Sequence, residues 1–315
     1  MPNDLRALGD QPQPDAALAT EQINPATVDI DRRSPLEMVR AMNAEDAGVA
    51  EAVGREAPQI AAAIEAIAAR MRRGGRLIYI GAGTSGRLGA LDAIECPPTF
   101  NIAPERIVGW VAGGPSALAA AAEAAEDSAE QGQADIERLA VAEPDVVVGI
   151  TASGRTPYAL GALTCARARG AFTIGLVCNA NAPLARLADI MIAPLVGPEV
   201  IAGSTRLKAG TAQKMTLNML STGTMLLLGK TFGNLMVDVQ ATNDKLRRRA
   251  LGIVQAGAGL NAAAAEAALQ AADGDARVAI LASRAGIAPA LARERLAAHG
   301  GVLRAAVDAT VDDTP

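Results

Sequence analysis

The chain has 315 residues, of which 50% are hydrophobic and only 2% aromatic, so its core must be built mainly from aliphatic side chains. The formal net charge of −5 argues against a nucleic-acid partner, because such proteins usually carry a basic face. His299 is the single histidine, which practically excludes a histidine-based metal site and disfavours a Ser-His-Asp mechanism. Acid–base chemistry is therefore expected from carboxylates, lysine or tyrosine.

Neither a targeting segment nor a membrane span is expected. Residues 1–19 contain "QPQPD" and no apolar core, which predicts a disordered lead-in rather than a signal peptide. Residues 215–237 are apolar but interrupted by polar side chains, which predicts a buried helix instead of a span. Cys96, Cys165 and Cys178 lack CxxC spacing, as is typical of reduced thiols, so we expect a cytoplasmic protein.

Two helices are predicted before the first strand. Ser34 suits an N-cap, and Pro35 suits the first position of the helix that follows. The second helix is indicated by an apolar stripe with spacings of 4, 3 and 4, formed by Ile60, Ile64, Ile67 and Met71. Gly74 follows this stripe, where helices often end on a left-handed glycine.

Short apolar runs then alternate with helical patterns. The predicted strands are "LIYI", "DVVVGI" (145–150), "AFTIGLVC" (171–178) and "DIMIAPL" (189–195), and an Ala/Leu-rich helix follows from Pro157. Continuous apolar strands that alternate with helices are typical of parallel sheets covered on both faces. We therefore predict an α/β fold, a doubly wound and mostly parallel sheet, with a small all-helical C-terminal domain after residue 243.

The turn after "LIYI" reads "GAGTSG" and has the G-x-G-x-x-G spacing of a dinucleotide-binding loop. Such a loop needs an acidic residue about twenty positions later to hold a ribose, and Asp92 and Glu95 come too soon. The Walker A pattern is missing as well. The hydroxyls of Thr84 and Ser85 instead favour a small anion, such as the phosphate of a substrate.

A second turn of the same kind, "TASGRT", follows the strand at 145–150. It carries the hydroxyls of Thr151, Ser153 and Thr156, with Arg155 at its rim. Hydroxyls and backbone N–H groups at a helix N-terminus are short donors that can converge on a phosphate monoester. Ordinary helix capping could explain either turn alone, but two such turns favour a shared phosphate site.

Two glutamates are candidate acid–base groups. Glu95 lies in "LDAIECPP", where the residue before proline is pushed out of the helical region, so we expect a helix to end there. Glu126 lies in "AAEAAEDS", and from composition alone it is a solvent-facing helix residue. The residues by themselves thus predict a phosphosugar-type pocket with an acidic catalyst.

Several long segments resemble the N-acetylmuramic acid 6-phosphate etherase family over about residues 20–305. They include "TEQINPATVDID", "RLIYIGAGTSGRLGALDAIECPPTF", "DVVVGITASGRTPYALGAL" and "GSTRLKAGTAQKMTLNMLSTGTM". The resemblance implies a sugar isomerase (SIS) domain with a tail that resembles a ubiquitin-associated domain. It also implies cleavage of a D-lactyl ether by elimination and water addition, in amino-sugar recycling, without a metal or redox cofactor.

The resemblance also implies roles for individual residues. Glu95 matches the acid that protonates the departing lactate, and Glu126 matches the second catalytic glutamate, as the base for the carbon-2 proton. The residues implied in sugar-phosphate binding are Thr84, Ser85, Ser153, Gly154, Arg155, Thr156, Ser204, Arg206 and Lys208.

The implied organisation is a lead-in at 1–19, a catalytic domain at 20–240 and a small helical domain at 241–315. The implied partner is a second copy of the chain, as SIS domains commonly form homodimers, with no nucleic acid and no membrane. Two alternatives stay open at this point. A SIS-type sensor would hold a sugar phosphate without catalysis, and a phosphosugar isomerase would leave the lactyl ether intact.

Overall fold

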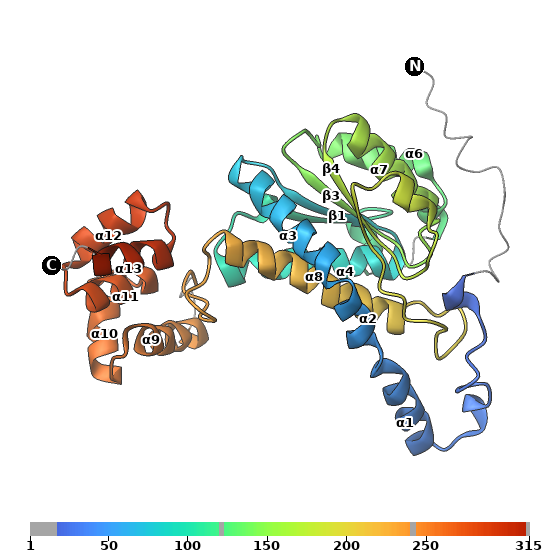
Figure 1. Cartoon of the computed structure of the whole chain (residues 1–315), viewed down its shortest axis with the longest axis horizontal. Coiled ribbons are helices and arrows are strands. Elements are labelled where there is room, and N and C mark those ends of the chain that lie inside the picture. Colours follow the sequence, from blue (N-terminus) through green and yellow to red (C-terminus); the bar gives the residue numbers. More distant parts are fainter. Residues whose placement is uncertain (1–17, 120–122, 240–243, 313–315) are drawn as a thin grey trace. The chain divides into compact units, whose positions relative to one another are not determined.

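The computed structural model describes residues 18–119, 123–239 and 244–312 (Figure 1). Residue contacts divide the chain into two compact units. The sheet unit comprises residues 1–94 and 105–221, and the helical unit comprises 95–104 and 222–315. Most of the predicted lead-in lies outside the described residues, and the predicted boundary between residues 240 and 241 stays a prediction.

The centre of the sheet unit is a parallel sheet that, in the described residues, has five strands in the order β2-β1-β3-β4-β5. The strands are β1 (Leu77–Gly81), β2 (Ile107–Val111), β3 (Val146–Ile150), β4 (Phe172–Leu176) and β5 (Ile190–Ile192). Every residue of β1 and β3 is buried, as expected of central strands covered on both faces. The predicted α/β class is confirmed.

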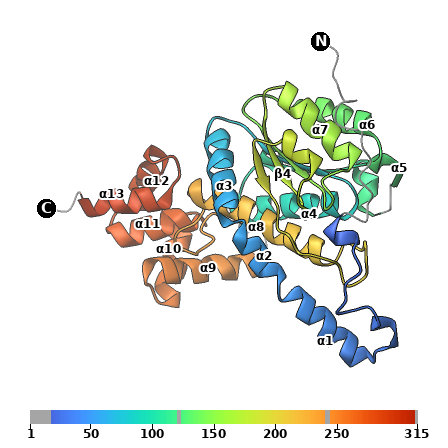
Figure 2. The ribbon, with the colours of Figure 1, turned by 45° about the vertical axis from the view of Figure 1, so that its right-hand side comes forward.

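Helices cover both faces of this sheet (Figures 1 and 2). The described α-helices before residue 228 are α1 (Pro35–Asp46), α2 (Val49–Arg55), α3 (Ala57–Arg72), α4 (Gly83–Phe100), α5 (Glu123–Glu126), α6 (Ala129–Arg138), α7 (Pro157–Ala168) and α8 (Lys208–Leu227). Helices α6 and α7 lie on one face, with Tyr158 and Leu163 of α7 in the core against Ile78, Ile80 and Val147. Helix α3 and the first parts of α4 and α8 lie on the other face.

The boundaries of the helices near the start of the chain agree with the predicted signals. Ser34 caps α1 in a reciprocal capping box with Glu37, and Pro35 is the first helical residue. Helix α3 buries Ile60, Ile67 and Met71, while Ile64 is half-buried. Gly74 has φ +95°, the left-handed conformation expected after a helix.

One strand was not predicted, and two predictions, the end of α4 and a helix over 215–237, need correction. Strand β2 was not predicted; it is short and contains Gly109, where a Cβ would lie 2.3 Å from Ala90 Cα of α4. Helix α4 does not end at Glu95 but continues through Pro97 and Pro98 to Phe100. The helix can continue through the two prolines because they remove only two backbone N–H donors from its hydrogen bonds. The helix ends where Asn101 takes a left-handed conformation, with φ +48°.

The apolar stretch 215–237 is helical only in part, since α8 begins at Lys208 and ends at Leu227. Within the described residues, no helix combines the length and apolarity needed to cross a bilayer.

Strands β1 and β3 are tied together where they begin. Asp145 accepts hydrogen bonds from the backbone N–H groups of Arg76 and Ala142 and forms an ion pair with the Arg76 guanidinium at 2.6 Å. Burial raises the pKa of Asp145, but the hydrogen bonds from Arg76 and Ala142 outweigh it and leave the pKa below its ordinary value. This ion pair holds the ends of the strands opposite to the two glycine turns.

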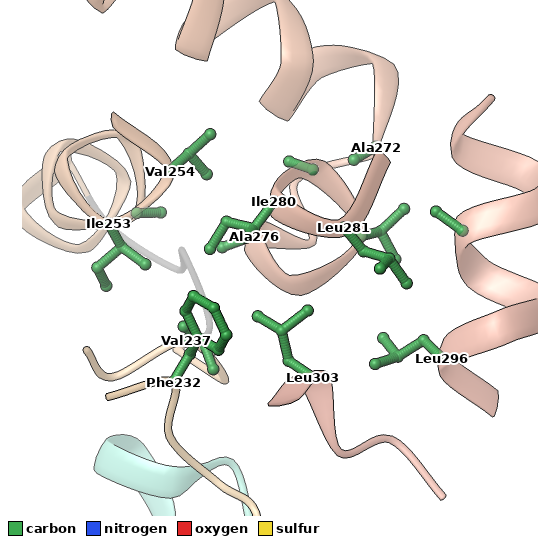
Figure 3. Packing of buried hydrophobic residues seen from close by; sticks show 14 of the residues in the cluster. Phe232, Val237, Ile253, Val254, Ala272, Ala276, Ile280, Leu281, Leu296 and Leu303 are labelled. Atoms are coloured by element: carbon green, nitrogen blue, oxygen red, sulfur yellow. The ribbon is translucent and has the colours of Figure 1, made fainter. Parts of the chain in front are cut away.

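In the helical unit, five helices are described: α9 (Asp244–Ala258), α10 (Ala262–Ala271), α11 (Ala276–Ala285), α12 (Pro289–Ala298) and α13 (Leu303–Asp312). Their core gathers small and aliphatic side chains around Ile280, Leu281 and Leu303, with Phe232 and Val237 from the preceding segment (Figure 3). The predicted helical C-terminal region is confirmed.

Candidate active site

A pocket of about 410 Å³ lies at the carboxyl ends of β1 and β3. The chain leaves β1 for β2 on one side, and β3 pairs with β1 on the other side, so the strand order reverses here. Open α/β sheets bind ligands at such reversal points, and the volume suits a small molecule. Both predicted turns reach this pocket.

The turn after β3 is held by its own residues. Thr151 Oγ1 lies 2.8 Å from Thr156 Oγ1, and it accepts a hydrogen bond from the N–H of Gly154 at 3.3 Å. The N–H of Arg155 donates to Ser153 Oγ at 3.1 Å. Gly154 has φ +72°, and a Cβ there would lie 2.3 Å from the Cβ of Ala182. The hydroxyls of this turn are therefore arranged by local contacts.

The turn after β1 depends on a distant helix. Thr84 and Ser85 are in the first turn of α4, and both line the pocket. The buried Ser85 hydroxyl donates to Oε1 of Gln213, in α8, at 3.0 Å. A Cβ on Gly210 would lie 3.6 Å from Thr84, so α8 packs directly against this turn.

Glu126 is the candidate catalytic group that the structure brings to the pocket. It ends α5, its side chain is exposed, and it lines the pocket. Thr156 Oγ1 approaches Glu126 Oε1 at 3.5 Å, and a Cβ on Gly83 would lie 3.9 Å from Oε2. Its carboxylate thus lies between the two turns. Solvent exposure, expected from composition, is compatible with a place at the pocket.

Glu95 is not among the described residues that line the pocket. It lies in the second half of α4, within the helical unit, and its side chain is exposed. Residues 91, 94, 95 and 98, spaced as one helical face, are all exposed. Leu91 and Ile94 are apolar residues with 50% and 62% of their surface accessible, so this face of α4 is apolar around the carboxylate.

The other predicted binding residues divide into two groups. Thr84, Ser85, Ser153 and Thr156 line the pocket, whereas Gly154, Arg155, Ser204, Arg206 and Lys208 are not among its lining residues. Gly154 shapes the turn through its backbone. Lys208 is buried and forms an ion pair with Glu45 at 2.7 Å. The hydrogen bond that Lys208 donates to the Glu45 carboxylate is the main cause that lowers the pKa of Glu45.

The sequence did not predict three polar residues that line the pocket, Glu21, Arg87 and Thr205. Glu21 belongs to a segment anchored by Thr20, whose carbonyl accepts from Gly203 N–H and whose hydroxyl accepts from Asn179. Arg87 Nε donates to the carbonyl of Ala117 at 3.0 Å. The motif "TEQINPATVDID" contains Glu21, but nothing in its local pattern indicates that it reaches a turn sixty residues later.

This fold and site define a SIS-domain protein. Residues 125–223 match the model of the SIS domain, and residues 59–167 match that of the glucokinase regulatory protein N-terminal SIS domain. The chain is 56% identical to an N-acetylmuramic acid 6-phosphate etherase of Rubrobacter xylanophilus over 92% of its length and 96% of the relative.

Relatives from other organisms extend this likeness. An N-acetylmuramic acid 6-phosphate etherase of Streptomyces avermitilis is 55% identical over 93% of this chain and 94% of its own length. One of Salmonella agona is 52% identical over 92% of this chain and 98% of its own length. The chain belongs to the N-acetylmuramic acid 6-phosphate etherase family.

Proposed function

We propose that this chain is a carbon–oxygen lyase that cleaves the D-lactyl ether of N-acetylmuramic acid 6-phosphate. The products are N-acetylglucosamine 6-phosphate and D-lactate. The observation that carries the proposal is the convergence of two hydroxyl-bearing turns and the Glu126 carboxylate on one pocket. More than half of the residues are identical to those of etherases over nearly the whole chain, which supports the same assignment.

The chemistry of the substrate fits these residue types. In the ring-opened sugar, the carbon-1 aldehyde acidifies the proton on carbon 2, and the lactyl oxygen on carbon 3 is a β-leaving group. Glu126 removes the carbon-2 proton, and the carbon-3–oxygen bond breaks. The family resemblance assigns protonation of the departing oxygen to Glu95, which does not line the pocket of its own chain, so in this proposal a second copy of the chain supplies that carboxyl group. Water then adds to carbon 3 of the unsaturated aldehyde while carbon 2 regains a proton.

The turns bind the phosphate in this proposal. Ser153 and Thr156 stand at the start of α7, and Thr84 and Ser85 at the start of α4, so two helix N-termini point at the same anion. Hydroxyls and backbone N–H groups hold a phosphate without adding bulk. The pocket then has room for the sugar beside Glu126.

The test is D-lactate release from N-acetylmuramic acid 6-phosphate by the purified chain. A phosphosugar isomerase would convert an aldose phosphate to a ketose and release no lactate, and a sensor would bind without turnover. The Glu95→Gln variant should lose most lactate release while it still binds N-acetylglucosamine 6-phosphate. Full activity of this variant would remove Glu95 from the mechanism.

We further propose that the chain forms a homodimer through the exposed face of α4. Leu91 and Ile94 lie on this face, and Met219 of α8 is 41% exposed. Glu95 shares the face, so a partner that covers it would also bury the surroundings of this carboxylate. Light scattering after gel filtration should give twice the chain mass, and Ile94→Asp should reduce it to one chain. A native monomer would contradict the proposal.

The proposed compartment is the cytoplasm. Cys165 and Cys178 are thiols, and burial raises the pKa of both above the ordinary value for cysteine. Cysteines that stay as free thiols are typical of proteins in a reducing environment.

A further inference from the structure

Gln213 is a buried polar residue that the proposed mechanism does not use. It lies in the second turn of α8, and only 1% of its surface is accessible. The start of α8 is fixed by Glu199, whose carboxylate accepts the N–H groups of Lys208 and Ala209, each at 2.9 Å. Because the start of α8 is fixed, the Gln213 side chain is held in a defined position beside the turn after β1.

The carboxamide of Gln213 is satisfied at only one end. Its Oε1 accepts the hydroxyl proton of Ser85 at 3.0 Å, while its Nε2 is buried and has no hydrogen-bond partner in the described residues. An unsatisfied buried donor destabilises the folded protein, because it has lost its hydrogen bonds to water without replacing them. In this arrangement the Ser85 hydroxyl directs its proton away from the pocket.

A bound phosphate requires the opposite direction of the hydroxyl. Phosphate oxygens are acceptors, so a hydroxyl that has given its proton to Gln213 offers the anion only lone pairs. The two ends of a carboxamide have nearly the same shape, and a half-turn exchanges them. After this half-turn, Nε2 donates to Ser85 Oγ, and the Ser85 proton becomes available to the phosphate.

We propose that Gln213 is a positioning residue for the phosphate of the substrate. It turns its carboxamide over when the sugar phosphate binds, and thereby makes Ser85 a hydrogen-bond donor to that phosphate. The inference rests on the proposed function in one respect, that the ligand is a sugar phosphate. Gln213 acts through Ser85 and touches no reacting atom.

The test compares two variants of Gln213 by titration calorimetry with N-acetylglucosamine 6-phosphate. In Gln213→Glu, the carboxylate can only accept, so it keeps the Ser85 proton directed away from the ligand. In Gln213→Met, the size is kept and the Ser85 hydroxyl is released. Thr216→Val is the matched control, because Thr216 is a buried hydroxyl of the same helix that donates to its own backbone, to the carbonyl of Ala212.

At pH 8 we expect Gln213→Glu to bind about tenfold or more weakly than the native chain, since a charge-assisted hydrogen bond is lost. Gln213→Met should lose only about threefold, and Thr216→Val should bind as the native chain does. The deficit of Gln213→Glu should shrink as the pH falls, because its protonated carboxyl can donate to Ser85. The native chain is titrated at each pH, since the phosphate itself titrates near pH 6.

Equal losses in both Gln213 variants, or a Gln213→Glu deficit that does not change with pH, would overturn the inference, because a merely structural role predicts both. If Gln213→Glu does not fold, the effect of Gln213→Met on ligand affinity is measured in a chain that also carries Ser85→Ala. There Gln213→Met should cause no further loss of affinity, and a further loss as large as in the native background contradicts the inference. The titration does not use lactate release, so a native chain that binds the ligand without turnover overturns the proposed function alone.

Discussion

The two turns of the pocket have similar sequences but are stabilised differently. The turn after β3 is closed by hydrogen bonds among residues 151–156. In the turn after β1, the hydroxyl of Ser85 is directed by Gln213, 128 residues later in the chain. The first arrangement follows from a local motif, whereas the second depends on the docking of α8. Similar hydroxyl patterns can therefore differ in how their donors are oriented.

Glu126 lies between the two turns and should give the largest effect when changed. Glu126→Gln keeps the size of the side chain but removes the proposed base, so lactate release should fall by about 10²- to 10⁴-fold. Binding of N-acetylglucosamine 6-phosphate should change little, because the turns stay intact. A coupled D-lactate assay and titration calorimetry measure the two quantities. Weak binding with normal turnover at saturation would place Glu126 among the binding groups instead.

The glycines of the two turns should differ in their tolerance of a side chain. Gly154→Ala combines a φ of +72° with a contact of 2.3 Å to Ala182, and should lower the free energy of unfolding by about 3 kcal/mol. Gly83→Ala has a φ of +53° but no atom nearer than 3.9 Å, and should cost about 1 kcal/mol. Urea unfolding measures both. Equal losses would show that the turn after β3 is not the tighter one.

Asp145 joins the starts of β1 and β3, the two strands that lead into the turns. Asp145→Asn leaves the half-exposed Arg76 without its ionic partner, and should cost about 2–3 kcal/mol of stability at pH 7. The pKa of Asp145 is lowered in the fold, so its contribution is present above the ordinary value of 3.8 and is lost as the pH falls through the folded pKa. The difference between native and variant in urea unfolding should therefore shrink at pH 3. A difference that does not depend on pH would contradict this origin.

The hydroxyls of the two turns can also be compared with each other. Ser85→Ala leaves the buried carboxamide of Gln213 without its partner and should cost about 2 kcal/mol of stability. Ser153→Ala removes a half-buried acceptor that water can replace, and should cost less than about 1 kcal/mol. Urea unfolding of the two variants side by side provides the measurement. A larger loss for Ser153→Ala would reverse the comparison.

Much of the fold could be predicted, because strands and caps are encoded locally. The apolar runs before both turns, the cap at Ser34 and the left-handed Gly74 all follow from short patterns. Strand β2 was missed although four of its five residues, Ile107, Val108, Trp110 and Val111, are β-branched or aromatic and favour a strand; only Gly109 interrupts the pattern. The end of α4 was misplaced because a proline rule was applied where the helix could lose two hydrogen bonds and continue to Asn101.

The site could be predicted only where its residues come from local motifs. Thr84, Ser85, Ser153 and Thr156 follow directly from the two turns, and the structure brings them together with Glu126. Glu21, Thr205 and Gln213 come from distant segments whose approach is decided by tertiary packing. No spacing in the sequence relates them to the turns, so their place near the pocket emerges only from the fold.

The proposed elimination is tested most directly by isotopes. The native chain is incubated with N-acetylmuramic acid 6-phosphate in deuterated water that carries oxygen-18, and the products are analysed by mass spectrometry and NMR. The account predicts oxygen-18 at carbon 3 of the sugar, deuterium at carbon 2 and D-lactate without oxygen-18. Oxygen-18 in the ether position of lactate, or a sugar without deuterium at carbon 2, would contradict it.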